Sequence, residues 1–348
     1  MKITSVYIPN LWGKYNITWN LKEHVNILSG INGSGKSTIL RAMASVLRGE
    51  SLPLAVSKRM SGIILQFDSG YTLKLNIQYD KAKSKGKTNN NENQPINFLK
   101  QKNSEQKIGE FEEFEVELIN RQQLSLSDAK NNKLDVSKFL AELKVGYIST
   151  FDCAPQRPDD PKVYFDYLLN SSYSELDRHL ENVVDRYKTY QIELSTRVTK
   201  MMSETKSRSD KNRAFIDIET LISRRSILQD IIDDLMKESG KHVNREKGDL
   251  EFVFHSDNSS HIYKDLSAGE KQLLLILLTV FMQENDKAIL IMDEPEISLH
   301  VDWQRRIIDI IRQLNPNCQI IVSTHSPAMI LNGWHSAVAN ISDLAKQN

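Results

Sequence analysis

Asp293 and Glu294 are adjacent carboxylates that directly follow the apolar run Ala288–Met292. A short apolar run between polar residues is typical of a buried strand. Two carboxylates at the C-terminal end of such a strand suit a magnesium ion with a general base beside it. The same pair could instead cap the helix that follows. Taken alone, these two residues leave both interpretations open.

A glycine-rich segment, Gly30–Ser37, matches the phosphate-binding pattern GxxxxGK[ST] in full. A predicted strand, Val25–Leu28, precedes it and a predicted helix, Ser37–Leu47, follows it, which is the context that the pattern requires. Backbone N–H groups of such a loop turn toward phosphates, and the start of the helix adds the positive end of its dipole. The pattern assigns Lys36 to the β- and γ-phosphates of ATP and the Ser37 hydroxyl to Mg²⁺. We expect these residues to contact the nucleotide: Gly30, Asn32, Gly33, Ser34, Gly35, Lys36, Ser37 and Thr38.

Two further segments carry polar groups between apolar elements. Leu266–Gln272 reads Leu-Ser-Ala-Gly-Glu-Lys-Gln, and its Ser267 is predicted to cap an apolar helix over Glu270–Phe281. A helix that begins with Ser-Ala-Gly offers exposed N–H groups to an anion. The predicted strand Gln319–Val322 ends at Ser323-Thr-His-Ser-Pro, which places His325 just beyond a strand.

The elements that must position these groups alternate between strand and helix. The strand Ala288–Met292, an amphipathic helix over Val301–Leu314 and the strand Gln319–Val322 predict a mostly parallel α/β sheet. Functional groups then gather at the C-terminal ends of its strands. Alternating patterns predict further strands, two of them in a hairpin around Asp68-Ser-Gly: Lys2–Ile8, Tyr15–Leu21, Ile63–Phe67, Tyr71–Tyr79, Phe111–Ile119, Val145–Ser149 and Leu250–Phe254. Lys81–Lys107 is polar throughout and predicts a mobile loop.

The middle of the chain changes character. From Tyr164 to Ser239 prolines are absent and apolar residues recur at helical spacing, which predicts two or three helices with a polar break at Ser203–Arg213. We therefore divide the chain into residues 1–163, a helical insertion at 164–248, and residues 249–348. The break carries a basic cluster, which fits a phosphate backbone and a solvated helix connection equally well: Lys206, Arg208, Lys211 and Arg213.

Composition narrows the class of protein. Lys+Arg and Asp+Glu number 45 each, so no overall charge attracts the chain to nucleic acid or a membrane. The longest apolar run, Leu273–Met282, is shorter than the about 20 residues that cross a bilayer. Cys153 and Cys318 are far apart and form no metal-ligand pattern, which favours free thiols in a reducing compartment. We expect a soluble, cytoplasmic protein.

Together these motifs resemble those of the ATP-binding-cassette (ABC) ATPases. In that superfamily Gly30–Ser37 corresponds to Walker A, Leu266–Gln272 to the signature, Ile289–Glu294 to Walker B, Ile297–His300 to the D-loop and His325 to the switch histidine. The resemblance implies an ABC-ATPase head: a mixed, mostly parallel sheet with flanking helices, plus an antiparallel β-lobe and here a helical insertion. It also implies ATP and Mg²⁺ as ligands.

The resemblance assigns roles to the motif residues. Asp293 holds Mg²⁺ with Ser37, Glu294 deprotonates the attacking water, and His325 contacts the γ-phosphate. Two heads would face each other as a homodimer, so that Ser267, Gly269 and Glu270 of one head reach the nucleotide of the other. The family's Q-loop glutamine has no clear position here. Gln156 is our candidate, and Gln66 is less suitable because it lies within a predicted strand.

Within the superfamily, Asp-Glu-Pro-Glu-Ile-Ser-Leu-His, Trp303-Gln304 and Ser-Thr-His-Ser-Pro resemble the OLD/RecF-like branch. That branch includes ATPase subunits of anti-phage systems such as PARIS, Septu and retrons, which act with a separate effector. We expect such a partner, a nuclease, because only Ser326–Asn348 follow the switch histidine. The alternative is a RecF-like DNA-binding repair ATPase. A transporter subunit is disfavoured by the insertion and by His300, and an SMC protein is disfavoured by the shortness of the insertion.

Overall fold

The computed structural model describes residues 1–80, 119–149, 174–204, 208–246, 250–256 and 258–347. Its centre is a five-stranded sheet in the order β14-β3-β13-β12-β8, and every neighbouring pair in it is parallel. The two central strands are buried along their whole length, which explains their continuous apolar runs. The strands are β3 (Val25–Ser29), β8 (Lys144–Ser149), β12 (Ala288–Asp293), β13 (Cys318–Ser323) and β14 (Val338–Asn340).

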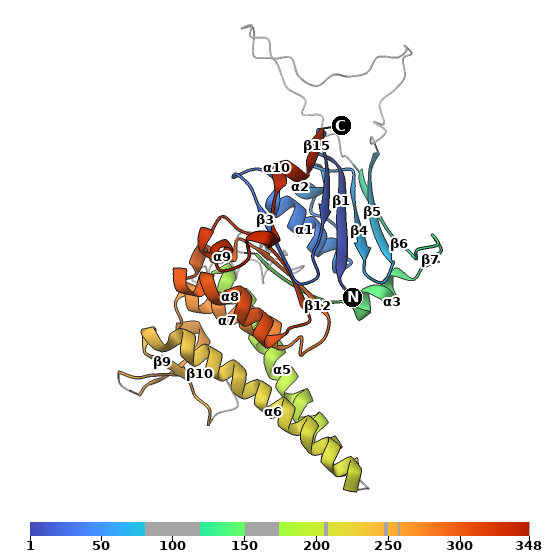
Figure 1. Ribbon diagram of the computed structural model, residues 1–348. Helices are drawn as coiled ribbons and strands as arrows, with labels where there is room; N and C mark the ends of the chain where they lie inside the picture. Colours follow the sequence, from blue (N-terminus) through green and yellow to red (C-terminus); the bar gives the residue numbers. More distant parts are fainter. Residues whose placement is uncertain (81–118, 150–173, 205–207, 247–249, 257, 348) are drawn as a thin grey trace, which may run out of the picture.

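A second sheet has seven strands in the order β15-β2-β1-β4-β5-β6-β7, all paired antiparallel (Figure 1). One face of its strands is apolar and buried, as the alternation along β1 shows. The strands are β1 (Ile3–Leu11), β2 (Tyr15–Asn20), β4 (Gly62–Phe67), β5 (Thr72–Asp80), β6 (Ile119–Ser127), β7 (Lys133–Leu134) and β15 (Ala345–Gln347).

The central sheet separates two hydrophobic cores. Along β12, Ile289 and Ile291 face the core that contains α1 (Lys36–Leu47) and the antiparallel sheet. Leu290 and Met292 face the other core, which contains α7 (Ala268–Phe281) and α8 (Val301–Leu314). The layers are therefore antiparallel sheet, α1, parallel sheet, and the pair α7 and α8.

Two long helices, α5 (Glu175–Glu204) and α6 (Arg208–Met236), project together away from the sheets and form an arm (Figure 1). The arm is anchored on α7, because Tyr187 and Tyr190 of α5 contact the ring of Phe281 at 5.9 and 5.7 Å between centroids. Arg224 of α6 lies over the same ring at 5.4 Å. A small antiparallel sheet follows the arm, in the order β11 (Ser260–Ile262), β10 (Glu251–Phe254) and β9 (Lys241–Val243).

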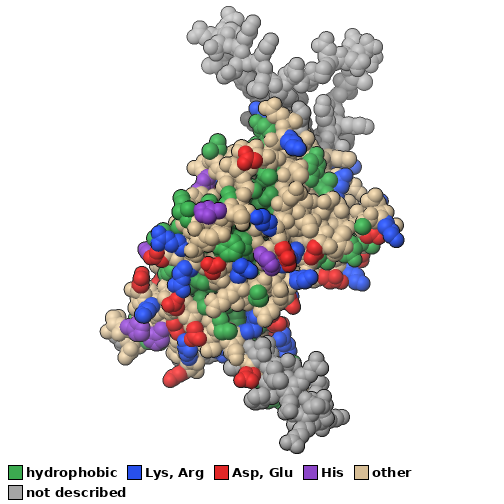
Figure 2. All heavy atoms as spheres, viewed as in Figure 1, with side chains coloured by type: hydrophobic (Ala, Val, Ile, Leu, Met, Phe, Trp, Pro, Cys, Tyr) green, Lys and Arg blue, Asp and Glu red, His purple; other side chains and the backbone are tan. Residues whose placement is uncertain are grey.

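Short elements complete the described parts of the chain. The helices among them are α2 (Leu54–Ser57), α3 (Val136–Glu142), η1 (Lys237–Ser239), η2 (Tyr263–Asp265), η3 (Pro295–Ser298), α9 (Pro327–Leu331), η4 (His335–Ala337) and α10 (Ile341–Leu344). Figure 2 shows Lys and Arg interspersed with Asp and Glu on the face drawn, in keeping with the balanced charge of the chain. Of the helices that the structure describes, none has the length and apolarity needed to traverse a bilayer.

The predicted fold class is confirmed, with differences in detail. The polar break predicted at Ser203–Arg213 is too wide, because α6 already begins at Arg208. The strand β6 starts where the predicted strand Phe111–Ile119 ends. It was not predicted because its sequence is mostly polar: Ile-Asn-Arg-Gln-Gln-Leu-Ser-Leu-Ser. The loop Lys81–Lys107, most of Phe111–Ile119, Cys153, Gln156 and the side chains of the basic cluster lie outside the described residues.

One buried side chain joins the two large sheets. Gln319 of β13 is fully buried, and its Oε1 accepts a hydrogen bond from the Ile3 N–H at 2.8 Å. Its Nε2 donates to the carbonyls of Ile3 at 2.8 Å and Lys22 at 2.9 Å. The polar glutamine in an otherwise apolar strand thus satisfies backbone groups of β1 and of the turn after β2.

Replacing Gln319 with Leu should lower the free energy of unfolding by about 3 kcal/mol, because buried backbone groups lose their partners. The measurement is a urea titration followed by tryptophan fluorescence. Gln313→Leu, at an exposed position of α8, is the matched control and should change it little. A loss below about 1 kcal/mol for Gln319→Leu would show that the two sheets do not depend on this contact.

Candidate active site

The register of three parallel strands brings the predicted site residues together. Ser323 at the end of β13 pairs with Asp293 at the end of β12, and also with Leu28 near the end of β3. The segments that follow these strands are the glycine-rich loop, the Asp293–Glu294 pair and the loop that contains His325. They therefore emerge side by side at one edge of the sheet.

The glycine-rich loop is exposed at Ile31, Asn32 and Gly33 and then enters α1. Gly35 has φ +101, in the left-handed region, and an added Cβ would lie 2.5 Å from the Trp12 ring. Glycine is therefore required there both by conformation and by space. Trp12, which the sequence did not single out, forms a wall behind the loop.

The start of α1 is open to an anion. Its first turn has no side-chain cap and no acidic residue, so its N–H groups and the dipole favour a negative ligand. Thr38 lies within this turn, and its hydroxyl accepts a hydrogen bond from Arg59 at 3.3 Å. An uncapped helix start without an acidic residue is the arrangement that phosphate binding needs.

Lys36 is buried, and its ammonium group is held within the protein. Its Nζ donates to the carbonyls of Gly30 at 3.1 Å and Ile31 at 3.2 Å. The His325 Nε2 lies 2.6 Å away and accepts when the lysine is charged. Burial lowers the pKa of Lys36, while the nearby carboxylates, Glu294 first, act in the opposite direction. The Lys36 ammonium group thus lies against the start of the glycine-rich loop.

Asp293 is fully buried at the end of β12. Its Oδ1 accepts hydrogen bonds from the Ser37 hydroxyl at 3.2 Å and from the Ser323 hydroxyl. A hydroxyl and a carboxylate at this distance are oxygen ligands of the kind that Mg²⁺ prefers. Within the described residues no group of three or more His, Cys, Asp or Glu could hold a metal by itself. The pair fits a magnesium ion that takes its other ligands from water and phosphate.

Glu294 adopts a strained backbone conformation, with φ +49 and ψ 51. This left-handed geometry costs a non-glycine residue roughly 1–2 kcal/mol. The Glu294 N–H is fixed by Ser323, whose carbonyl lies at 3.0 Å and whose hydroxyl lies at 3.2 Å. The Glu294 Oε1 lies 3.4 Å from His325 Nε2. Burial, and next the charge of Asp293, raise the pKa of the Glu294 carboxyl, as suits a general base.

The signature residues form a separate group around the start of α7. The Ser267 hydroxyl caps the helix by accepting from the Glu270 N–H at 3.4 Å, and the Ser267 N–H donates to Glu270 at 2.8 Å. An added Cβ on Gly269 would lie 2.4 Å from the carbonyl oxygen of Ser298 in η3. Gly269 therefore lets the signature pack closely against the D-loop of the same chain.

The Glu270 side chain points inward rather than toward a ligand. It is 2% exposed, and Lys241 Nζ donates to both of its oxygens at 2.8 Å, with Ser239 donating at 2.8 Å as well. Burial alone would raise the pKa of Glu270, but the hydrogen bonds, led by that of Lys241, lower it overall. We propose that Glu270 positions the helix start and that Ser267 and Gly269 are the groups left to meet a nucleotide.

The signature does not join Lys36, Asp293, Glu294 and His325 among the contacts of the described residues. Its neighbours are Ser298, Ser239 and Lys241 instead. Gln66 is also elsewhere: it lies within β4 and accepts a hydrogen bond from Ser5 at 2.7 Å. One chain therefore brings Lys36, Asp293, Glu294 and His325 together, while the signature residues contact η3 and the segment after α6.

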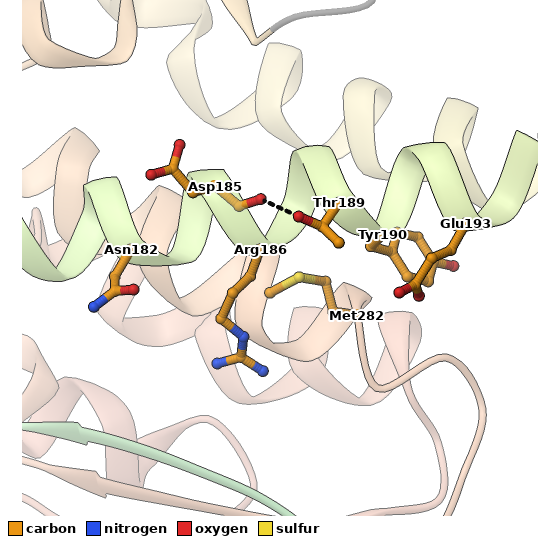
Figure 3. A pocket seen from close by; sticks show the side chains of 7 residues that line it. All are labelled: Asn182, Asp185, Arg186, Thr189, Tyr190, Glu193 and Met282. Atoms are coloured by element: carbon orange, nitrogen blue, oxygen red, sulfur yellow. Dashed lines mark hydrogen bonds between the residues drawn. The ribbon is translucent and has the colours of Figure 1, made fainter.

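Two surface hollows lie outside this cluster. One, of about 390 Å³, runs along α5 beside the end of α7, and Figure 3 shows Arg186 and Met282 among the side chains that line it. Its walls contain none of the motif residues. The other, of about 570 Å³, lies between α8 and α9 and is lined in part by Gln304 and Ser326, next to the switch histidine.

Comparison with known proteins agrees with the motifs. The model of the AAA ATPase domain family matches residues 1–330, so the chain belongs to that family, and it is an ATPase.

Relatives named for defence systems are similar to this chain. The retron Vc95 probable ATPase of Vibrio cholerae is 23% identical over an alignment of 391 positions, which covers 98% of this chain and 73% of that protein. The Septu protein PtuA of Bacillus thuringiensis is 27% identical over 94 residues, 23% of this chain and 24% of that protein. A crystal structure of an SMC head bound to the C-terminal winged-helix domain of ScpA covers 100% of this chain with a TM-score of 0.52 at 17% identity, which shows the fold alone.

The raised pKa of Glu294 predicts a pH-dependent effect on stability. The folded protein holds this proton more tightly than the unfolded chain does, so the charged carboxylate lowers the free energy of unfolding above its ordinary pKa of about 4.3. Glu294→Gln should raise Tm at pH 8, because the amide removes the charge that burial and Asp293 disfavour. At pH 4 the two proteins should melt together.

Differential scanning fluorimetry across this pH range makes the comparison. Glu246→Gln, at an exposed position after β9, is the control and should match the wild type throughout. A Glu294→Gln variant that is less stable than the wild type at pH 8 would contradict the assignment of Glu294 as a half-buried, unfavourably placed charge.

Proposed function

We propose that two copies of this chain close around ATP and that this ATP-dependent dimer controls a separate effector, a nuclease, in bacterial defence against phage. The observation that supports the dimer is that the motifs of one chain fall into two separate groups. Lys36, Asp293, Glu294 and His325 converge, while Ser267 and Gly269 present the N-terminus of α7 elsewhere. A second copy related by two-fold symmetry would supply the missing signature.

The residues of one chain divide the work of hydrolysis. Lys36 would exchange the carbonyls of Gly30 and Ile31 for phosphate oxygens, and the first turn of α1 would bind them as well. Ser37 and Asp293 would hold Mg²⁺, which neutralises charge on the phosphates. The γ-phosphorus is attacked by a water whose proton goes to Glu294, and the bond to the ADP oxygen breaks.

Lys241 explains how the signature can accept a phosphate despite the acidic residue in its first turn. A carboxylate at a helix start would repel an anion, but both oxygens of Glu270 are bound by the Lys241 ammonium. Ser267 and Ala268 remain exposed at the helix start. A γ-phosphate from the other head would therefore meet N–H groups and a hydroxyl without a nearby uncompensated charge.

The dimer predicts a specific behaviour of Glu294→Gln. Without the general base the bound ATP persists, so with ATP and Mg²⁺ this variant should elute at roughly twice the 39.9 kDa of one chain. Size-exclusion chromatography with light scattering measures this. Adding Lys36→Ala to the same variant should abolish the dimer, because the phosphates lose their main cation. A Glu294→Gln protein that stays monomeric at saturating ATP would contradict the proposal.

The role in defence rests on the similarity to the retron and Septu ATPases, and it predicts a protein partner. Affinity purification of tagged Glu294→Gln from its host with ATP should recover a nuclease, and Lys36→Ala should not. Recovery of DNA in a salt-sensitive manner, with no protein, would instead favour the DNA-repair alternative.

A further inference from the structure

Glu296 lies two residues after Glu294, in η3, and is 8% exposed. Its Oε1 accepts three hydrogen bonds, and all come from the loop that carries the switch histidine. The donors are the Thr324 hydroxyl at 2.6 Å, the His325 N–H at 2.7 Å and the Ser326 N–H at 3.2 Å. Hydrogen bonds to an ionised acceptor are about twice as strong as those between neutral groups.

Gln304 of α8 makes a second bridge between the same two segments. Its Nε2 donates to the carbonyls of Glu296 at 3.1 Å and Leu299 at 2.8 Å. Its Oε1 accepts from the Ser326 hydroxyl at 2.6 Å. The turn after Asp293–Glu294 and the loop 324–326 are thus connected by side chains on both sides.

The ring of His325 depends on this support. It lies 2.6 Å from Lys36 Nζ and 3.4 Å from Glu294 Oε1, both through Nε2. Those contacts engage the ring alone, and both partners must change them when ATP binds. The His325 backbone N–H is held by Glu296 instead. A bond that involves neither Lys36 nor Glu294 can keep the histidine in place while they bind phosphate and water.

We infer that Glu296 is a positioning residue that holds the loop 324–326 to the turn after Asp293–Glu294. His325 then keeps its place, and the two segments move as one unit. The inference rests on the proposed function, because it assumes that His325 acts in ATP turnover. The two glutamates then have different roles, since Glu294 serves as the base and Glu296 fixes the geometry around it.

The charge of Glu296 contributes to this role. Three donors converge on one oxygen, which a carboxylate satisfies better than an amide does. Glu296 Oε2 is buried and has no hydrogen-bond partner within the described residues. A glutamine would keep an acceptor for the loop but would bury an amide NH₂ there without an acceptor. Glu296→Gln should therefore lower kcat for ATP hydrolysis less than Glu296→Ala does, but kcat should still fall below that of the wild type.

The test is steady-state ATP hydrolysis with Mg²⁺ for Glu296→Ala, His325→Ala and the double variant, with ATP affinity measured in parallel. A shift of about 1 Å at a reacting centre can cost on the order of 10²-fold in rate. We expect Glu296→Ala to lower kcat to the level of His325→Ala while ATP affinity stays within about threefold. The double variant should be no slower than His325→Ala, because residues that act as one unit are not additive.

Each other outcome is decisive. A kcat for Glu296→Ala near the wild type, with His325→Ala impaired, overturns the inference and leaves the proposed function intact. Additive losses in the double variant also overturn it, since the two residues would then act separately. An unimpaired His325→Ala removes the role of the histidine and overturns the inference, whereas the proposed function is tested separately by the ATP-dependent dimer of Glu294→Gln.

A second pair of variants covers the case in which Glu296→Ala does not fold. Gln304→Met removes the second bridge while keeping the length of the side chain, and Gln313→Met on the exposed side of α8 is its matched control. Like Glu296→Gln, Gln304→Met should lower kcat at unchanged ATP affinity, and Gln313→Met should not. Wild-type turnover in both Glu296→Gln and Gln304→Met would overturn the inference.

Discussion

The site depends on the register of β3, β13 and β12. Leu28, Ser323 and Asp293 occupy paired positions in these strands, so the segments that follow must leave the sheet together. Parallel strands that are buried on both faces resist a shift in register, because the shift would move apolar side chains to the polar edge of the sheet. The convergence of Lys36, Asp293, Glu294 and His325 is therefore a consequence of packing in the two cores, with Ser323 holding both Asp293 and the strained Glu294 in place.

A second constraint concerns the signature helix, which lies between the sheet and the arm. Glu270 is bound to Lys241 and Ser239 just beyond α6, and Lys271 pairs with Asp177 near the start of α5 at 2.6 Å. The Lys241–Glu270 and Lys271–Asp177 ion pairs are largely shielded from water. Ion pairs in such places are stronger than at the surface. The position of the signature is thus set by the bases of both arm helices, and by the close approach of Gly269 to Ser298.

The sequence predicts most of the layout because its strongest patterns coincide with its best-packed elements. The predicted helix Val301–Leu314 has the same bounds as α8, and the predicted strands before Asp293 and Ser323 agree with β12 and β13 to within one residue, since apolar periodicity there reflects burial. β6 was not predicted because most of its side chains are polar; Arg121 and Gln123 are exposed, as residues on one face of an antiparallel sheet can be. The roles of Glu270, Glu296 and Trp12 could not be predicted either, since they depend on which distant residues fold against them. Glu270 looks like a ligand in sequence and is a buried partner of Lys241 in space.

We propose that each active site combines the glycine-rich loop of one chain with the signature of another. Mixing two inactive variants, Lys36→Ala and Ser267→Arg, tests it most directly by ATP hydrolysis. In an equal mixture half of the dimers are mixed, and each of these keeps one intact site, so about a quarter of the wild-type rate should return. A mixture that stays as inactive as either variant alone would contradict the shared site.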